Sequence, residues 1–404
     1  MRFPDHLYIH IPFCRSRCRY CSFSAVVASR VPEEEYRAAL ECEFVRRCEA
    51  WELDDRRSCL ETVYFGGGTP SLLSPSFYAG FLEWLAAKVE LPAGVEITLE
   101  ANPADLDRNK AAALRAAGIN RISLGGQTFS DVGLRLLGRR HRAEEIGKAV
   151  AFIRAAGIEN LSLDLICAWP GESIAILERD LEELVNLEPD HVSVYLLSLE
   201  AGTVLERLVR KGRVEAVADE KQVEMMRLVA ERLEKKGFFR YEVSNFSRTA
   251  ALQSRHNLGY WHLSDYLGLG AAACGSRRCR RGEEHWAERY RNHDNPESYL
   301  DEIAAFRSGP EAFAEGELFT LPWEDLEIID RNASFREALM LGLRLRRGVR
   351  LAELENEYGP ERVAAVTGRA GTLLREGLLA MENGYLWVTA KGLPLSDEIT
   401  VALI

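Results

Sequence analysis

Three cysteines near the start of the chain have the spacing of an iron–sulfur site. Cys14, Cys18 and Cys21 form a C-x3-C-x2-C pattern directly after the apolar run 7–11. Thiolates are soft ligands that select iron–sulfur clusters, zinc or copper(I), and a 4Fe–4S cluster held entirely by protein needs four of them. The next position that would supply a fourth ligand is Phe23. The spacing therefore predicts a 4Fe–4S cluster with one iron left open for a chelating small molecule.

A structural zinc site is the alternative for the same cysteines. Such a site is usually four-coordinate and uses paired C-x2–4-C spacings, whereas the next cysteine, Cys42, lies inside a helical pattern. The remaining cysteines show no ligand spacing and are expected to be small buried hydrophobic residues. They are Cys42, Cys48, Cys59, Cys167, Cys274 and Cys279.

Composition places the chain without deciding its chemistry. Its 404 residues suffice for one large domain and a small one. Nine cysteines, an odd number, without a signal peptide or an apolar run near 18 residues predict a soluble, cytoplasmic protein that does not cross a membrane. The formal net charge of -11 argues against nucleic acid as a general partner.

Apolar runs rich in Val and Ile alternate with amphipathic helical stretches, which is the pattern of a parallel sheet with crossover helices. Strands are expected over 6–11, 61–65, 95–100, 119–124, 161–167 and 191–197. Helices are expected over 33–51, 76–89, 107–117, 143–156, 173–186 and 219–236. These units predict an α/β fold with a partial (β/α)6 barrel of the TIM type, which gathers functional residues at the C-terminal ends of its strands.

Four of the predicted strands carry residues that suit a binding site. The second strand runs into the glycine run 66–68, where backbone groups can approach a ligand closely. Glu100 ends the third strand and Gln127 follows the fourth, so both side chains are expected to project into the mouth of the barrel. Asp164 lies within the apolar fifth strand, where an acid needs a partner or a ligand.

Several segments together resemble one branch of the radical S-adenosylmethionine (SAM) superfamily. This branch contains oxygen-independent coproporphyrinogen III dehydrogenase and the HemW-type haem chaperones. In the superfamily the open iron of a three-cysteine cluster binds the amino and carboxyl groups of SAM, and an electron from the cluster splits SAM into methionine and a 5'-deoxyadenosyl radical. The segments are YIHIPFCRSRCRYC, YFGGGTPS, LEANP, ISLGGQTF, GRRHRAEE, LDLICAWPGE, YEVSNFSR, RHNLGYW, DYLGLGAAACG, EALMLGLRLRRGV and LWVTAKGLPLSDEI, which span nearly the whole chain.

Two features divide that branch. The dehydrogenase has a further cysteine two positions after the third ligand, whereas this chain has Phe23 there, as HemW-type proteins do. The HNLGYW segment, 256–261, is also similar to the chaperone group. The resemblance therefore favours a HemW-type protein.

The resemblance implies roles for particular residues. It makes Cys14, Cys18 and Cys21 the cluster ligands, and it places the first SAM against Tyr8, Gly67, Glu100 and the backbone of Cys274. In the dehydrogenase a second SAM lies nearby, and the matching positions here are Tyr20, Gly68, Thr69, Gln127, Arg139, Asp164 and Ser198. Because Tyr20 and Ser198 replace the Phe and Ala of that enzyme, the chain is expected to bind one or two SAM molecules. Cys274 also departs from HemW-type proteins, which usually have His there.

Haem, the cargo that the resemblance implies, needs an axial ligand, and His, Cys and Met all serve. The candidates are His256, His262, Cys274 and Cys279. His256 is the first choice because it heads the HNLGYW segment and has aromatic neighbours. The arginine-rich stretch 277–281 is expected to be solvated, with contact to porphyrin propionates as the alternative.

The last part of the chain predicts a small winged-helix domain. Three helical patterns from residue 334 on precede a hairpin over 379–389 and a last helix, and Asn383-Gly384 is a strong hairpin turn. The chain is thus expected to divide into a radical SAM partial barrel (1–245), a connector that carries the haem or substrate segment (246–332) and a winged-helix-like domain (333–404). A lid or docking role suits this domain better than DNA binding, since its charges balance.

These observations predict a 4Fe–4S protein of the radical SAM type that binds haem and delivers it to an acceptor, such as a membrane-associated haemoprotein of respiration. A radical SAM methyltransferase with paired SAM molecules is the first alternative, because Gln127, Arg139 and Asp164 suit it. Coproporphyrinogen III dehydrogenase is the second, which Phe23 disfavours.

Overall fold

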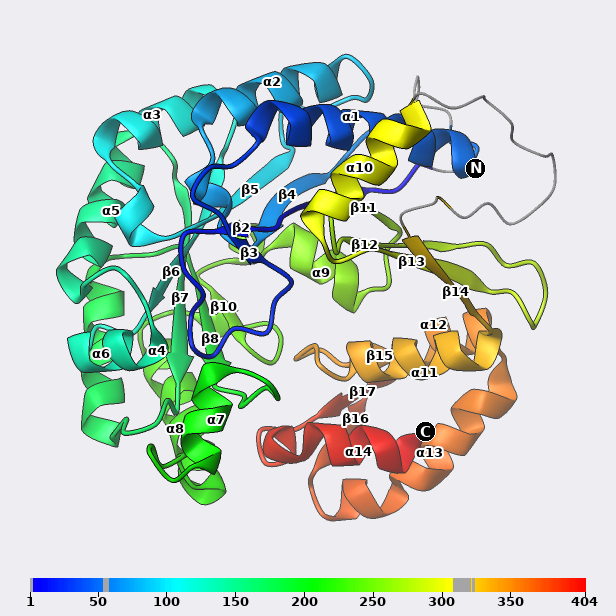
Figure 1. The fold of residues 1–404 in the computed structure, drawn as a ribbon. Helices are drawn as coiled ribbons and strands as arrows, with labels where there is room; N and C mark the ends of the chain where they lie inside the picture. Colours follow the sequence, from blue (N-terminus) through cyan, green and yellow to red (C-terminus); the bar gives the residue numbers. More distant parts are fainter. Residues whose placement is uncertain (1–2, 54–57, 308–320, 322–323) are drawn as a thin grey trace.

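A parallel sheet with helices on its outer side forms the first half of the molecule (Figure 1). The structure is a computed structural model that describes residues 3–53, 58–307, 321 and 324–404. Six parallel strands neighbour one another in chain order: β1 (His6–Ile11), β4 (Thr62–Gly67), β5 (Glu96–Ala101), β6 (Arg121–Gln127), β7 (Asn160–Cys167) and β8 (His191–Leu196). The six strands confirm the expected α/β fold with a partial barrel.

A helix follows each of these strands. The helices are α1 (Glu33–Ala50), α2 (Pro75–Ala86), α3 (Arg108–Ala116), α5 (Ala143–Ala155), α6 (Ile174–Asn186) and α8 (Asp219–Lys235). Their ends follow local chemistry: the side chain of Asp107 caps α3 by accepting from the Lys110 N–H, and Gly118, with φ +108°, turns the chain away after it. Two short helices, α4 (Asp131–Leu137) and α7 (Val204–Arg210), lie in the connections.

The sheet continues beyond the predicted strands. On one side β11 (Tyr266–Leu269) pairs parallel with β1, and β12 (Cys274–Arg278), β13 (Ala287–Asn292) and β14 (Glu324–Ile329) add antiparallel strands. On the other side β8 pairs with β10 (Asn245–Ser247), which pairs with β9 (Phe239–Arg240). Helices α9 (Arg255–Trp261) and α10 (Pro296–Arg307) lie along the same stretch of chain. Part of the predicted connector is therefore continuous with the main sheet.

Residues 331–403 form a small helical unit with a wing. It contains α11 (Arg331–Gly342), α12 (Leu351–Tyr358), α13 (Pro360–Arg375), the hairpin β16 (Leu379–Glu382) and β17 (Tyr385–Val388), and α14 (Ser396–Leu403). Asn383 and Gly384 have φ of 51° and 77°, as a two-residue hairpin turn requires. A short strand, β15 (Val349–Arg350), pairs with β17. The order of helices and hairpin confirms the predicted winged-helix pattern.

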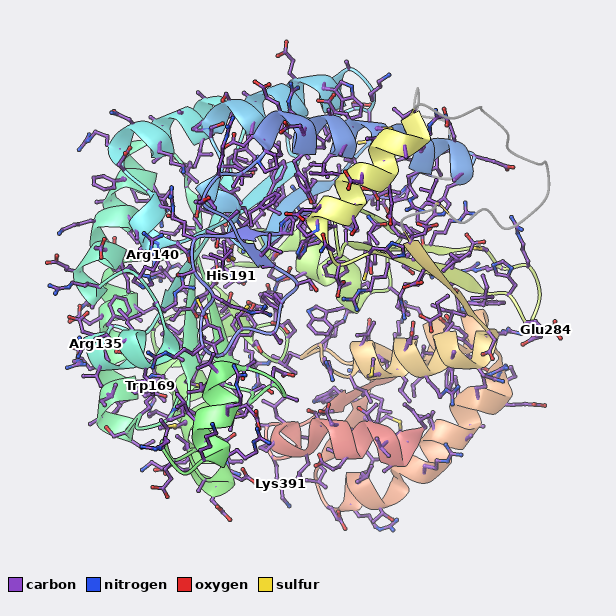
Figure 2. All side chains as sticks on the ribbon, viewed as in Figure 1. Arg135, Arg140, Trp169, His191, Glu284 and Lys391 are labelled. Carbon is purple, nitrogen blue, oxygen red and sulfur yellow. The ribbon has the colours of Figure 1, made fainter. Side chains whose placement is uncertain are left out.

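Side chains fill the space between sheet and helices (Figure 2). The main apolar core lies between the strands and α1, α2, α3, α5, α6 and α8, and a separate apolar core lies among α11–α14. A small third cluster joins α4 and α7 through Leu137, Trp169 and Leu205. Figure 2 places His191 in the interior, where its ring nitrogens lie 2.8 Å from Ser162 Oγ and 2.8 Å from Tyr241 Oη. None of the helices in the described ranges is long and apolar enough to cross a membrane.

Candidate functional site

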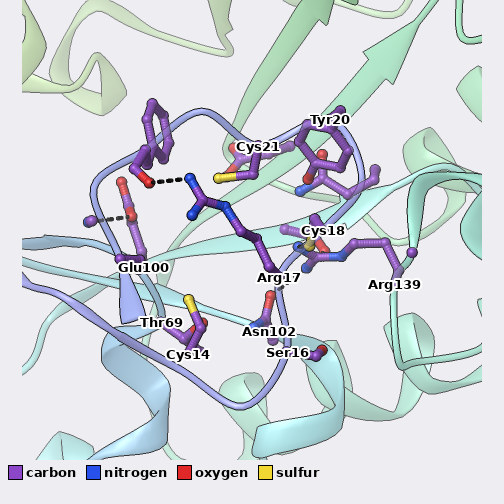
Figure 3. Close-up of a pocket in the computed structure, with 18 of the residues that line it drawn as sticks. Cys14, Ser16, Arg17, Cys18, Tyr20, Cys21, Thr69, Glu100, Asn102 and Arg139 are labelled. Carbon is purple, nitrogen blue, oxygen red and sulfur yellow. Dashed lines mark hydrogen bonds between the residues drawn. The ribbon is translucent and has the colours of Figure 1, made fainter. Parts of the chain in front are cut away.

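A cavity of about 520 Å³ lies at the C-terminal ends of the parallel strands (Figure 3). This edge is where a barrel of this type gathers its functional groups. The cavity brings together most of the residues that the sequence analysis selected. Those that line it are Cys14, Cys18, Tyr20, Cys21, Gly67, Gly68, Thr69, Glu100, Gln127, Arg139, Asp164 and Ser198.

The three cysteines reach the cavity from the loop that follows β1. Cys14 ends the two-residue strand β2 (Phe13–Cys14), which pairs with β3 (Val26–Val27) and holds both ends of the loop. The Thr69 hydroxyl donates to Cys14 Sγ over 3.3 Å, and Arg139 Nη1 donates to Cys18 Sγ over 3.6 Å. Donors aimed at sulfur suit thiolates that carry negative charge.

The arrangement of the sulfur atoms does not suit a single metal ion. Only one group of three His, Cys, Asp or Glu side chains in the described ranges has ligand atoms within 4.8 Å of one another, and it is Cys279, His285 and Glu288. Thiolates around one zinc ion, with Zn–S bonds of about 2.3 Å, would lie closer together than that limit. The wider separation of the three loop cysteines fits a cluster of several irons better than the zinc alternative.

The glycine run after β4 brings backbone next to the cysteine loop. The Gly68 N–H donates to the Ile11 carbonyl over 2.8 Å. A Cβ on Gly68 would lie 2.8 Å from the Phe13 carbonyl oxygen and 3.1 Å from Cys14 Sγ, and one on Gly67 would lie 2.6 Å from the His10 ring. Gly67 also has φ +111°, which L side chains rarely adopt. The absence of side chains here is therefore required by packing as well as by access to a ligand.

Glu100 is the carboxyl group that faces this run. It accepts hydrogen bonds from Tyr64 Oη over 2.8 Å and from the Gly67 N–H over 3.1 Å. Burial raises its pKa to about 7, and the two hydrogen bonds oppose the rise. A carboxyl group so poised responds to a cationic ligand near neutral pH.

Asp164 and Gln127 lie on the neighbouring strands. Asp164 accepts from the hydroxyls of Ser123 over 2.8 Å and Ser162 over 3.0 Å, which answers the expectation that an acid in an apolar strand needs partners. Burial raises the pKa of Asp164, and its hydroxyl partners lower it. Gln127 has φ +66° beside an irregularity in the β6–β7 pairing. Strained backbone of this kind clusters at ligand sites.

Arg139 joins the cysteine loop to β6. Besides Cys18 it donates to the carbonyl of Gly125 over 3.0 Å and to Asn102 Oδ1. Figure 3 shows its side chain reaching toward Cys18 and Asn102. Its guanidinium is thus fixed in place to meet an anionic group of a ligand.

Three of the predicted site residues lie outside the lining. Tyr8 Oη lies 2.9 Å from His10 Nδ1, and the Tyr8 ring stacks on Tyr64, which does line the cavity. Cys274 begins β12 and is half-buried. His256 is 1% exposed, and its two ring nitrogens lie 2.7 Å from Thr62 Oγ1 and 2.9 Å from Tyr260 Oη. Both ring nitrogens of His256 therefore already have hydrogen-bond partners, and its role as an axial ligand stays a prediction.

Sequence analysis missed Tyr64, Asn102 and Tyr195, which also line the cavity. Tyr64 is in register with Tyr8 in the β1–β4 pairing. A period of two backwards from Gly66 would have placed Tyr64 on the same face, so the sequence did contain this signal. Asn102 acts through Arg139, a contact that no spacing reveals.

Comparison with known proteins agrees with this geometry. The Radical SAM superfamily model matches residues 8–184, and the HemN C-terminal domain model matches residues 329–395. A protein of Bacillus subtilis named "Heme chaperone HemW" is 32% identical over 398 residues, covering 98% of this chain and 98% of the relative. The "Heme chaperone HemW" of Lactococcus lactis is 31% identical over 98% of this chain and 96% of its own length.

Two further relatives extend the comparison. The mitochondrial "Radical S-adenosyl methionine domain-containing protein 1" of Bos taurus is 34% identical over 98% of this chain and 87% of its own length. The solved coproporphyrinogen III oxidase HemN of Escherichia coli, a radical SAM enzyme, matches 100% of this chain and 90% of its own, with a TM-score of 0.80 and 21% identity. The structural match supports the fold.

Family membership implies a 4Fe–4S cluster and SAM, and the cavity fits both. Three thiols line it with donors on two of them, and a glycine run and a carboxyl group face them. Burial raises the pKa of Cys14 and Cys21, so bound iron is what would keep these thiols deprotonated. The chain belongs to the radical SAM superfamily and, within it, to the family of the HemW-type proteins.

Proposed function

We propose that this protein is a haem chaperone that binds haem and delivers it to acceptor haemoproteins. The observation that carries the proposal is similarity over 98% of the chain to relatives named haem chaperones. Phe23 supports it, because this position at the rim of the cavity holds no fourth thiol. We expect the protein to act in the cytoplasm on acceptors that include membrane-associated haemoproteins.

We propose that Cys14, Cys18 and Cys21 hold the cluster and that the cavity around them binds SAM. The open iron would take the SAM amino and carboxyl groups, and the cluster would supply an electron to the bound SAM. Glu100 and the backbone at Gly67 would position SAM, with Tyr8 supporting the site from behind Tyr64. The other predicted lining residues described above would contact a second SAM molecule if one binds. Cys274, which lies outside the lining, would contact the first SAM through its backbone only.

The residues of the chain would position the bound SAM and exclude water from the cavity. The loop 14–27, whose ends are paired through β2 and β3, contributes one wall of the cavity over the strand ends. Arg139 offers a fixed cation and Asp164 an acceptor held by hydroxyls. We propose that residues 1–245 provide this machinery, that 246–332 carry the cargo segment and that 333–404 form the docking domain.

A radical SAM methyltransferase is the second candidate. Gln127, Arg139 and Asp164 line one cavity with the cysteines, as paired SAM molecules would require. Such an enzyme would release S-adenosylhomocysteine and 5'-deoxyadenosine together when given its substrate. Coproporphyrinogen III dehydrogenase is a third candidate, which the absence of a cysteine at position 23 disfavours.

The test is an anaerobic haem titration of the cluster-reconstituted full-length protein, followed by its Soret absorbance. We expect saturable binding of one haem per chain and transfer of that haem to an apo-haemoprotein that then gains its holo spectrum. Absence of saturable binding, or binding with no transfer to any of several apo-haemoproteins, would refute the chaperone function. Coupled formation of the two nucleosides on a substrate would instead establish the methyltransferase.

A further inference from the structure

A second cavity lies where the sheet meets the C-terminal helical unit. Its volume is about 780 Å³, within the range of sites that hold a drug-sized or cofactor-sized ligand. Lining residues come from β9 and α9 on one side and from α11, β15, α12 and β17 on the other. The two sides are held together by the Arg346 N–H, which donates to the Tyr241 carbonyl over 2.9 Å, and by a β-bridge between Glu242 and Leu345.

Positive charge gathers in this cavity, although the chain as a whole carries -11. The charged residues of its lining are the glutamates Glu353 and Glu357 and the arginines Arg240, Arg278, Arg346, Arg347 and Arg350. An excess of arginine in a concave site is the arrangement that binds carboxylates or phosphates.

Two of these arginines stand out because they lack an acidic partner. Arg278, Arg346 and Arg350 each form an ion pair with a carboxylate, at 3.4, 3.1 and 3.2 Å. Within the described ranges Arg240 and Arg347 form none. Arg347 instead lies over the Tyr385 ring, 4.4 Å from its centroid, and donates to the Tyr385 hydroxyl. The charge of these two guanidinium groups is therefore not paired with a carboxylate of the protein, which suits a ligand with two carboxylates.

A histidine lines the same cavity. His262 directly follows α9 and, in the described part of the chain, its ring has no hydrogen-bond or ion-pair partner. Burial lowers its pKa, with Arg347 adding to the effect and Glu353 opposing it, so the imidazole is neutral at neutral pH. A neutral imidazole is the form that ligates iron. His262 thus has the available nitrogen that His256 lacks.

The rest of the lining is apolar and aromatic. Leu258, Leu263 and Trp261 face it from α9 and the turn after it, and Leu345 and Tyr385 face it from the C-terminal unit. Trp261 Nε1 is buried and, among the described residues, has no hydrogen-bond partner. A large ligand with a flat apolar body and an acidic edge matches this combination of walls.

We propose that this second cavity is the haem site, that His262 ligates the iron and that Arg240 and Arg347 bind the two propionates. The inference rests on the proposed haem-binding function and adds the place and the residues. Haem carries two carboxylates on one edge of an apolar ring and one iron at its centre. The two arginines would bind the carboxylates, the apolar and aromatic walls would pack on the ring, and the histidine would bind the iron. The cargo would then lie between the sheet and the winged-helix unit, apart from the cysteine-lined cavity.

The propionate contacts are tested with single substitutions in the full-length, cluster-loaded protein. Charge-assisted hydrogen bonds are stronger than neutral ones, so R240Q and R347Q should each weaken haem binding by roughly tenfold or more. R344Q is the matched control: it removes an arginine of the C-terminal unit that lies outside the lining of this cavity and pairs with Asp397 at 3.0 Å, and it should bind haem as the parent does. Haem dimethyl ester, which lacks the two free carboxylates, should bind the parent weakly, and its affinity should differ little between the parent and the arginine variants.

The iron ligand is tested spectroscopically. H262A should change the Soret band and the spin state of bound ferric haem, and added imidazole should restore them. If the parent binds haem and neither H262A, R240Q nor R347Q alters that binding, or if R344Q weakens it equally, the inference fails while the chaperone function stands. If the parent binds no haem, the function fails and the inference with it. Retained thermal midpoint and cluster absorbance show that each variant is folded.

Discussion

Glu100 is a buried carboxyl group, and its burial should make the stability of the folded protein depend on pH. Burial raises its pKa in the folded chain to about 7, against an ordinary value of 4.5. Between these pH values the folded state binds more protons than the unfolded state, so the free energy of unfolding falls as pH rises through this window. Below about pH 7 the carboxyl group of the folded protein is therefore mainly neutral, and a cationic ligand would favour its ionised form.

We predict that E100Q stabilises the SAM-free protein by about 1–2 kcal/mol at pH 8, since a neutral amide replaces a partly screened, desolvated charge. The difference from the parent should shrink to near zero at pH 4, below the ordinary pKa of 4.5, where the carboxyl group is protonated in both the folded and the unfolded chain. SAM affinity of E100Q should fall roughly tenfold at pH 8. Urea unfolding at the two pH values measures the first effect, and an equal difference at both would contradict the assignment.

For single residues, the sequence predicted which side chains gather at the cavity, but not which hydrogen bonds those side chains form within the protein. Cys14, Cys18 and Cys21 follow from spacing alone, and Asp164 follows from an acid in an apolar strand. The sequence did not reveal the hydrogen bonds of His256 to Thr62 and Tyr260, because the contact with Thr62 depends on how the strands and α9 come together. Contacts between distant segments leave no trace in spacing.

The element that fixes the cysteine loop is the turn from β4 into the glycine run. A Cβ at position 68 would meet backbone oxygens of Ile11 and Phe13 at 2.9 and 2.8 Å, which cannot move without shifting β2. We predict that G68A destabilises the protein by about 1–3 kcal/mol and lowers the iron and sulfide retained per chain. Its control is G94A, where a Cβ meets nothing within 4 Å and no loss is expected. Equal iron retention in both variants would contradict this role of the turn.

Some strands could be predicted from the sequence and others could not. Strands β1 and β4–β8 were predicted to within three residues at each end, because strands covered on both faces read as apolar runs. Strand β13, Ala287–Asn292, has the sequence AERYRN: Glu288, Tyr290 and Asn292 are buried on one face and Arg289 and Arg291 lie on the other, so no apolar run marks it. Its partner β14 lies more than 30 residues further along the chain, and this strand was therefore missed, as were β11, β12 and β14.

On the scale of the whole molecule, one buried network joins the first helix to the late strands. Glu43 of α1 accepts from the Gly270 N–H over 2.8 Å, from Asn292 Nδ2 over 2.6 Å and from Tyr299 Oη over 2.5 Å. One turn on, Arg47 pairs with Glu324 of β14. Because β14 leads directly into α11, which lines the second cavity, this network also sets the position of the C-terminal unit.

We predict that E43A lowers the free energy of unfolding by about 3–5 kcal/mol. The substitution leaves three buried hydrogen-bond donors without an acceptor, and it removes one of the two carboxylates near the buried Arg47 guanidinium. The matched control is E41A on the same helix, where the ion pair with Arg37 at 2.9 Å is partly exposed and is worth less than about 1 kcal/mol. Urea unfolding followed by circular dichroism compares the two. Because the network supports β14 and hence α11, E43A should also weaken haem binding at temperatures below its unfolding transition, whereas E41A should not. Unchanged haem affinity in a folded E43A protein would show that the late strands do not position the second cavity.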